Sequence, residues 1–134
     1  MTSIVTYKGN LRTEATHLQS GSKITTDAPK DNAGKGEAFS PTDLVATALG
    51  SCMVTIMGIL ANNEGIDLKE ISFKIVKVMD SNPRRISRIE IEIDMKTNFN
   101  SHEKRRLENA AINCPVAKSL HPEIEQIINF IYPE

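Results

Sequence analysis

Two cysteines, Cys52 and Cys114, are the residues of this sequence that are best suited to chemistry. A thiolate can attack an electrophile, and two thiols that meet in the folded chain can form a disulfide reversibly. They lie 62 positions apart, so only the fold could bring them together. Free cysteine is also among the most buried residue types, and the alternative is that both thiols are inert core residues.

Two other kinds of site have weaker support in the sequence. Lys35, in a Gly-Lys-Gly run, resembles part of a phosphate loop, but no predicted strand precedes it and no Ser or Thr follows it. His17, His102 and His121 could join the cysteines around a metal ion, but none of them shows the paired spacing of a zinc site. We therefore expect neither a bound metal nor a cofactor.

The composition predicts one soluble domain that covers residues 1–134. A net charge of −1 gives the chain no electrostatic attraction to nucleic acid or to an anionic membrane. The N-terminus has neither the charged start nor the apolar stretch of a signal peptide, and two cysteines do not make a disulfide framework. We expect a cytoplasmic protein in which any disulfide is transient.

The hydrophobic pattern predicts an α+β fold. N-terminal antiparallel hairpins are expected from two glycine turns of two residues each, Gly9-Asn10 and Gly21-Ser22. The predicted strands cover residues 4–8, 11–18, 23–27, 71–75, 89–95 and 125–132. Residues 28–39 show no periodicity, and we predict a loop there that is either a mobile connector or a cover over a site.

A long, buried central helix is predicted between these strands. Ser40-Pro41-Thr42-Asp43 is a strong helix start, and Gly65 should end the helix after about Asn63. Residues 44–61 carry no charge and reach the lower length limit of a membrane span, but the glycines and hydroxyl residues among them favour a core helix. One sheet covers only one side of such a helix, so we predict a homodimer with the helix near its interface.

A second helix pair precedes the final strand. From about Ser101, the spacing of four apolar residues at i, i+3, i+4 and i+7 predicts a buried stripe, formed by Leu107, Ala110, Ala111 and Cys114. Pro115 should start a short helix through Lys118. Because Cys114 precedes that helix start, local physics favours a thiolate at Cys114, whereas Cys52 in mid-helix should have a raised pKa.

Two segments resemble the OsmC/Ohr family of thiol-dependent peroxidases. They are FSPTDLVATALGSCMVTIMGIL, residues 39–60, and NCPVAKSLHPEI, residues 113–124. The order of the predicted elements is also similar along almost the whole chain. The resemblance implies an intertwined homodimer, with long central helices enclosed by sheets, that reduces organic hydroperoxides in oxidative or osmotic stress.

The resemblance also assigns roles to residues. Cys52 matches the cysteine that attacks the peroxide and becomes a sulfenic acid, and Cys114 matches the one that resolves it as a disulfide. An external dithiol would then reduce the disulfide. The resemblance thus makes Cys52 the reactive thiolate, whereas the helix start favours a thiolate at Cys114. A positive charge near Cys52 is therefore needed to stabilise its thiolate. The family uses an arginine of the N-terminal hairpin, which corresponds to Arg12.

One position departs from the family. The peroxidases place a glutamate directly after the proline of the first motif, where this chain has Thr42, and the carboxylate is shifted to Asp43. Asp43 could hold Arg12 in place or only cap the helix, and it lies roughly 13 Å from Cys52 along a helix. It could therefore assist only the cysteine of a partner subunit. The alternative function is a non-catalytic dimer that binds a small apolar ligand or a partner protein.

Overall fold

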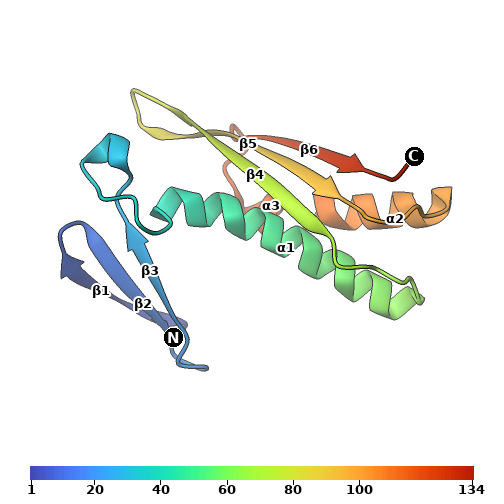
Figure 1. The fold of residues 1–134 in the computed structure, drawn as a ribbon, viewed down its shortest axis with the longest axis horizontal. Helices are drawn as coiled ribbons and strands as arrows, with labels where there is room; N and C mark the ends of the chain where they lie inside the picture. Colours follow the sequence, from blue (N-terminus) through green and yellow to red (C-terminus); the bar gives the residue numbers. More distant parts are fainter. The chain divides into compact units, whose positions relative to one another are not determined.

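The computed structural model describes all 134 residues, which form two compact units. The first unit, Met1–Val45, contains a three-stranded antiparallel sheet. The second unit is Ala46–Glu134. In the first unit the strands β1 (Ser3–Gly9), β2 (Arg12–His17) and β3 (Lys23–Asp27) lie side by side in chain order (Figure 1). The prediction of a single domain for residues 1–134 stays a prediction.

The two turns of this sheet differ in how well they were predicted. The β1–β2 connection is the expected tight turn, in which Gly9, Asn10 and Leu11 all have positive φ. The predicted two-residue turn at Gly21-Ser22 is wrong, because β2 and β3 are joined by the five residues 18–22. The hydroxyl of Ser20 accounts for the longer loop, since it bonds His17 Nδ1 at 2.6 Å and accepts the Ser22 N–H at 3.2 Å.

The predicted loop at residues 28–39 is confirmed, and it closes on itself. Apart from the short 3₁₀ turn η1 (Lys30–Asn32), it has no regular structure. Its ends meet where the Asp27 N–H donates to the Phe39 carbonyl oxygen at 3.1 Å. Gly34 passes so close to Ala28 that a Cβ there would lie 1.7 Å from the Ala28 carbonyl oxygen. Only glycine therefore fits at that point.

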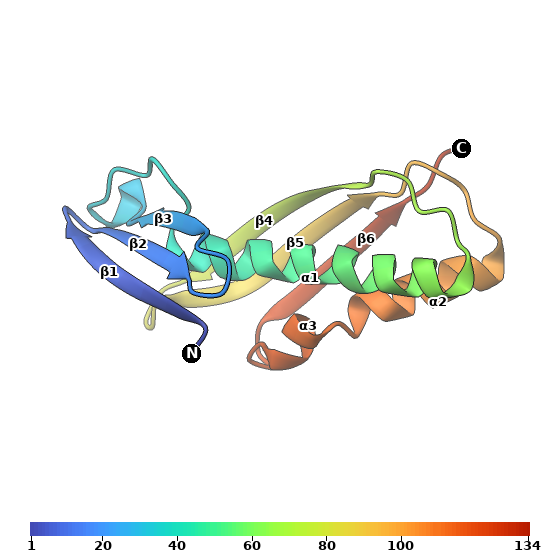
Figure 2. The same ribbon diagram turned by 90° about the horizontal axis from the view of Figure 1, so that it is seen from below.

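The second unit is built on the sheet β4-β5-β6, with bounds Ser72–Asp80, Arg85–Asp94 and Glu125–Ile131. β4 and β5 are antiparallel, whereas β6 runs parallel to β5 after the helices α2 (Ser101–Ile112) and α3 (Pro115–Ser119). Along β5 the fully buried Ile89, Ile91 and Ile93 alternate with outward-facing carboxylates. α1 and α2 lie on the buried face of the sheet (Figure 2).

The central helix α1 (Pro41–Glu64) begins and ends as predicted. Its start is a reciprocal cap, in which Ser40 Oγ accepts the Asp43 N–H at 3.1 Å and Asp43 Oδ2 accepts the Ser40 N–H at 3.0 Å. Gly65, with a φ of 67°, follows its last residue. One stripe of the helix is buried, formed by Ala46, Leu49, Gly50, Met53, Met57 and Ala61.

The rest of α1 is more exposed within this chain. Its most apolar 18 residues have a mean hydropathy of 2.1, enough by length and composition to cross a membrane, and 33% of that window is buried. The buried stripe packs on the sheet, as a core helix does. Gly50 makes a close approach possible there, because a Cβ on it would lie 2.6 Å from Ile75 Cδ1 of β4.

Candidate active site

Cys52 lies in the middle of α1, beside the stripe of the helix that packs on the sheet. Its neighbour Met53 is fully buried, whereas Cys52 itself is partly exposed and packs against the core cluster. The position follows from helix periodicity, since residues next to a buried stripe lie at its border. Cys52 is therefore attached to a rigid element and keeps an accessible side.

Cys114 occupies the junction between α2 and α3. Asn100 and Glu103 form a capping box that starts α2, and the helix ends at Ile112. Cys114 is then the N-cap of α3, with Pro115 as the first helical residue, as predicted. Its exposed fraction is 0%, which confirms that the thiol is buried, although it lies outside the helix whose stripe predicted it.

The fold brings these two thiols close together, although neither the position of Cys52 in α1 nor that of Cys114 before α3 requires it. Both cysteines are free, and Cys52 lies close enough to Cys114 to influence the pKa of its thiol. Burial raises the pKa of the Cys114 thiol, and the neighbouring Cys52 thiol acts in the same direction. Desolvation therefore favours the protonated form of the Cys114 thiol.

The expectation that the helix end favours a thiolate at Cys114 is corrected by this geometry. The backbone N–H groups of Ala117 and Val116 do lower the pKa of Cys114, as a helix start should. Desolvation in the core is the larger effect and reverses the sign. The partly exposed Cys52 is thus the more accessible of two neighbouring thiols.

Arg12 starts strand β2 in the first unit, and a carboxylate that sequence reasoning missed holds it. Its Nε donates to Asp27 Oδ1 at 2.7 Å and its Nη2 donates to Asp27 Oδ2 at 2.8 Å. Glu37 Oε1 lies 3.4 Å from the same Nη2. The hydrogen bond to Arg12 holds the pKa of Asp27 below its usual range, and the same bond raises the pKa of Arg12.

The pairing of Arg12 with Asp27, which sequence reasoning missed, depends on the register of β2 and β3. A two-residue turn at Gly21-Ser22 would place Arg12 opposite Asp31, whereas the observed loop places it opposite Asp27. No local signal in the sequence indicates this pairing. The predicted supporting residues Thr42 and Asp43 lie in the first turn of α1, where Asp43 caps the helix with Ser40. The capping role expected of Asp43 is therefore observed, and the carboxylates bonded to Arg12 are Asp27 and Glu37.

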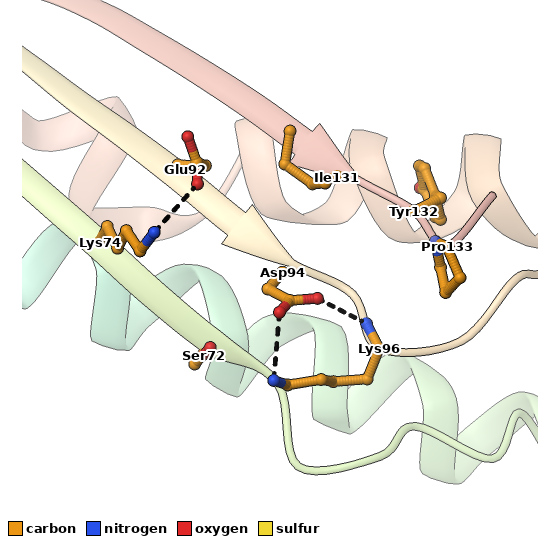
Figure 3. Close-up of a pocket in the computed structure, with 8 residues that line it drawn as sticks. All are labelled: Ser72, Lys74, Glu92, Asp94, Lys96, Ile131, Tyr132 and Pro133. Atoms are coloured by element: carbon orange, nitrogen blue, oxygen red, sulfur yellow. Dashed lines mark hydrogen bonds and ion pairs between the residues drawn. The ribbon is translucent and has the colours of Figure 1, made fainter.

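A cavity of about 360 Å³ opens on the other face of the second sheet (Figure 3). It is lined by Ser72, Lys74, Glu92, Asp94, Lys96, Ile131, Tyr132 and Pro133. Its charges satisfy one another, since Lys74 Nζ lies 3.6 Å from Glu92 Oε1 and Lys96 Nζ lies 3.1 Å from Asp94 Oδ2. The side chains of Glu92 and Asp94 point away from the core that contains the thiols. The cavity is thus separate from the thiol pair.

Comparisons with known proteins agree on one family. The model of the OsmC-like protein family matches residues 34–128. A proposed osmotic stress induced and detoxification response protein from Psychrobacter arcticus 273-4 is 50% identical, with a TM-score of 0.94 over 98% of this chain and 96% of that chain. No match was found among curated proteins.

More distant structures share the fold. The organic hydroperoxide resistance protein OsmC of Legionella pneumophila is 18% identical, with a TM-score of 0.76 over 97% of this chain and 96% of that one. The organic hydroperoxide resistance protein OhrB of Bacillus subtilis is 19% identical, with a TM-score of 0.68 over 98% of both chains. Together with the family match over most of its length, these findings confirm the resemblance: the chain belongs to the OsmC-like family.

Proposed function

We propose that this protein is a thiol-dependent peroxidase that reduces organic hydroperoxides with Cys52 and Cys114. The observation that carries the proposal is the pairing of an accessible thiol with a buried thiol whose pKa is raised. A peroxide-reducing cysteine needs access to substrate, and its resolving partner needs only to be close to it. Two inert core thiols would need neither the contact nor the difference in exposure.

The reaction has two steps on the protein. In the first step the Cys52 thiolate attacks one oxygen of the O–O bond, so that the sulfur is oxidised to a sulfenic acid and the peroxide leaves as an alkoxide that takes up a proton to become an alcohol. In the second step the Cys114 sulfur attacks the sulfenic acid, a disulfide forms, and water leaves with the Cys114 proton. An external dithiol then reduces the disulfide and is itself oxidised.

Arg12 is proposed as the cation that activates Cys52. A guanidinium stays protonated at any working pH, so it stabilises both a thiolate and a developing alkoxide. Asp27 binds Nε and Nη2 of the guanidinium, and neither Asp27 nor Glu37 accepts a hydrogen bond from its Nη1. That nitrogen is therefore suited to an additional anion.

The relatives support the substrate class. The Legionella pneumophila and Bacillus subtilis proteins are both named for organic hydroperoxide resistance, and the Psychrobacter arcticus protein for osmotic stress and detoxification. A role in stress protection is the common element of these names. Because both thiols must return to the reduced form after each cycle, we also propose a reducing, cytoplasmic location.

A homodimer is proposed as the working form. Within this chain several large apolar side chains are exposed, among them Ile59 of α1 at 52% and Val5 and Tyr7 of β1 at 63% and 64%. A second copy would bury such surface, and the face of α1 that the sheet does not cover would lie near the interface. Sedimentation of dilute protein should give a dimer, and a stable monomer would contradict this assignment.

The test of the peroxidase is chemical. Reduced protein is exposed to a stoichiometric amount of cumene hydroperoxide, and its mass and free thiols are measured. We expect an intramolecular Cys52–Cys114 disulfide in the wild type, and no peroxide consumption by Cys52→Ser. Thiols that are unchanged by excess peroxide would show instead a non-catalytic module of the kind that binds an apolar ligand or a partner.

A further inference from the structure

Two carboxylates from different segments of the first unit hold the guanidinium of Arg12. Asp27 ends strand β3, and Glu37 belongs to the loop of residues 28–39. We propose that Asp27 and Glu37 are positioning residues for Arg12, and that the loop of residues 28–39 serves to hold them there. The inference rests on the proposed role of Arg12 in activating Cys52.

Asp27 is the fixed part of this arrangement. Its side chain is only 2% exposed, and its two oxygens accept two parallel hydrogen bonds from Arg12 at 2.7 and 2.8 Å. Such a forked pair fixes the plane of the guanidinium as well as its distance. A buried carboxylate without a cation would be very unfavourable, so folding of this unit holds Arg12 in one orientation.

The loop is tied to the same carboxylate. Asp27 Oδ2 accepts a third hydrogen bond, from the backbone N–H of Glu37 at 3.1 Å. Further backbone bonds close the loop on itself and on the β1–β2 turn, from Gly36 to Ala28 at 3.2 Å and from Ala28 to Leu11 at 3.1 Å. Asp27 therefore connects the strand that carries Arg12 with the loop that carries Glu37.

Glu37 makes the weaker and more exposed of the two contacts with Arg12. Its carboxylate is 63% exposed and lies 3.4 Å from Arg12 Nη2, a weaker contact than the fork with Asp27. Nε bonds Asp27 alone, and Nη2 is shared between Asp27 and Glu37. The third nitrogen of the guanidinium, Nη1, bonds neither carboxylate. The two carboxylates thus leave Nη1 for a further anion, which in the proposed function is the Cys52 thiolate.

The experiment compares four variants of the full chain in two measurements. The first is the pKa of the Cys52 thiol, from the pH dependence of its alkylation rate. The second is kcat/KM for cumene hydroperoxide. The variants are Arg12→Ala, Asp27→Asn, Glu37→Gln and, as a matched control, Glu14→Gln. Glu14 is a carboxylate of β2, the strand that also carries Arg12; it pairs with Lys23 at 3.6 Å and does not bond Arg12.

We expect Asp27→Asn to raise the Cys52 pKa almost as much as Arg12→Ala does, and to lower kcat/KM by roughly 10- to 100-fold, since small misplacements of a catalytic group have effects of this size. Glu37→Gln should lower kcat/KM by about 2- to 5-fold, because an exposed ion pair contributes little. Glu14→Gln should change neither quantity by as much as about 2-fold.

Arg12→Lys keeps the inference testable if Asp27→Asn does not fold, because lysine leaves the buried carboxylate paired with a cation. Lysine lacks the forked geometry, so we expect kcat/KM to fall by at least about 10-fold while the Cys52 pKa rises less than in Arg12→Ala. A fully active Arg12→Lys, or an Asp27→Asn that folds and behaves as wild type while Arg12→Ala does not, would overturn the positioning role.

The outcomes separate this inference from the function on which it rests. If Arg12→Ala leaves the Cys52 pKa unchanged, the arginine has no part in activating the thiol, and the positioning role is refuted with it. If Arg12→Ala raises that pKa and Asp27→Asn does not, the activation stands and the positioning role alone fails. A Cys52 that does not react with peroxide in any variant refutes the peroxidase itself.

Discussion

Replacing Cys114 with alanine tests which thiol attacks the peroxide. Cys114 is 0% exposed and belongs to the core cluster, so the substitution removes one buried sulfur atom and leaves a small cavity. A void of that size costs roughly 1 kcal/mol in free energy of unfolding, so the variant should fold. Urea denaturation measures this cost. A loss above about 3 kcal/mol would mean that Cys114 contributes more to the core than its size indicates.

The chemical effect of Cys114→Ala should be larger than its effect on stability. Without a resolving thiol, the sulfenic acid at Cys52 persists, and a second peroxide oxidises it to the sulfinic acid. The intact mass should therefore rise by about 32 Da in the variant, whereas the wild type becomes about 2 Da lighter as the disulfide forms. Peptide mapping should place the two added oxygens on Cys52.

Cys52→Ser is the matched control for this experiment. Burial raises the pKa of Cys114, so the remaining thiol should stay protonated and its mass should stay unchanged in the same time. Oxidation of Cys114 in this variant, at a rate close to that of Cys52 in Cys114→Ala, would refute the reasoning. The local field of the helix end would then outweigh burial, and the two roles would be exchanged.

Two further predictions concern the second unit. A Cβ at Gly50 would lie 2.6 Å from Ile75 Cδ1. Gly50→Ala should therefore lower the free energy of unfolding, measured in urea, by roughly 1 kcal/mol, because overpacking outweighs the better helix propensity of alanine. A more stable variant would contradict the close approach. Burial, followed by the hydrogen bond that Tyr132 donates to Glu108, raises the pKa of Tyr132. The protonated tyrosine therefore contributes fully to the stability of the fold below the ordinary tyrosine pKa of about 10, and this contribution decreases as the pH rises above that value. Tyr132→Phe should cost about 1 kcal/mol at neutral pH and should remove part of the loss of stability between about pH 9 and 11; equal alkaline losses in both proteins would contradict it.

The limits of α1 could be predicted from the sequence because their causes are local. The cap at Ser40 and Asp43 and the stop at Gly65 each depend on residues within one helical turn of them. The alternation of Ile89, Ile91 and Ile93 with carboxylates likewise predicts which face of β5 is buried. Local rules were sufficient for these features because the interacting groups are neighbours in the chain.

The partner of Arg12 could not be predicted in this way. It depends on the register of β2 and β3, which follows from a loop longer than a glycine turn, in which the Ser20 hydroxyl bonds His17 and Ser22. A change of a few residues in one loop is enough to change the residue that lies opposite Arg12. An error in the length of the loop changes the partner of every residue along the two strands, because the loop sets the register of the whole pair.

The sequence by itself determined the two thiols, their elements and the family to which the chain belongs. The tertiary structure alone decided that burial outweighs the helix start at Cys114 and raises the pKa of its thiol. A helix start acts on the pKa through backbone groups next in the chain, and the sequence therefore shows it. Desolvation depends on every side chain that packs around the sulfur, most of them remote in sequence, and at Cys114 it is the larger effect.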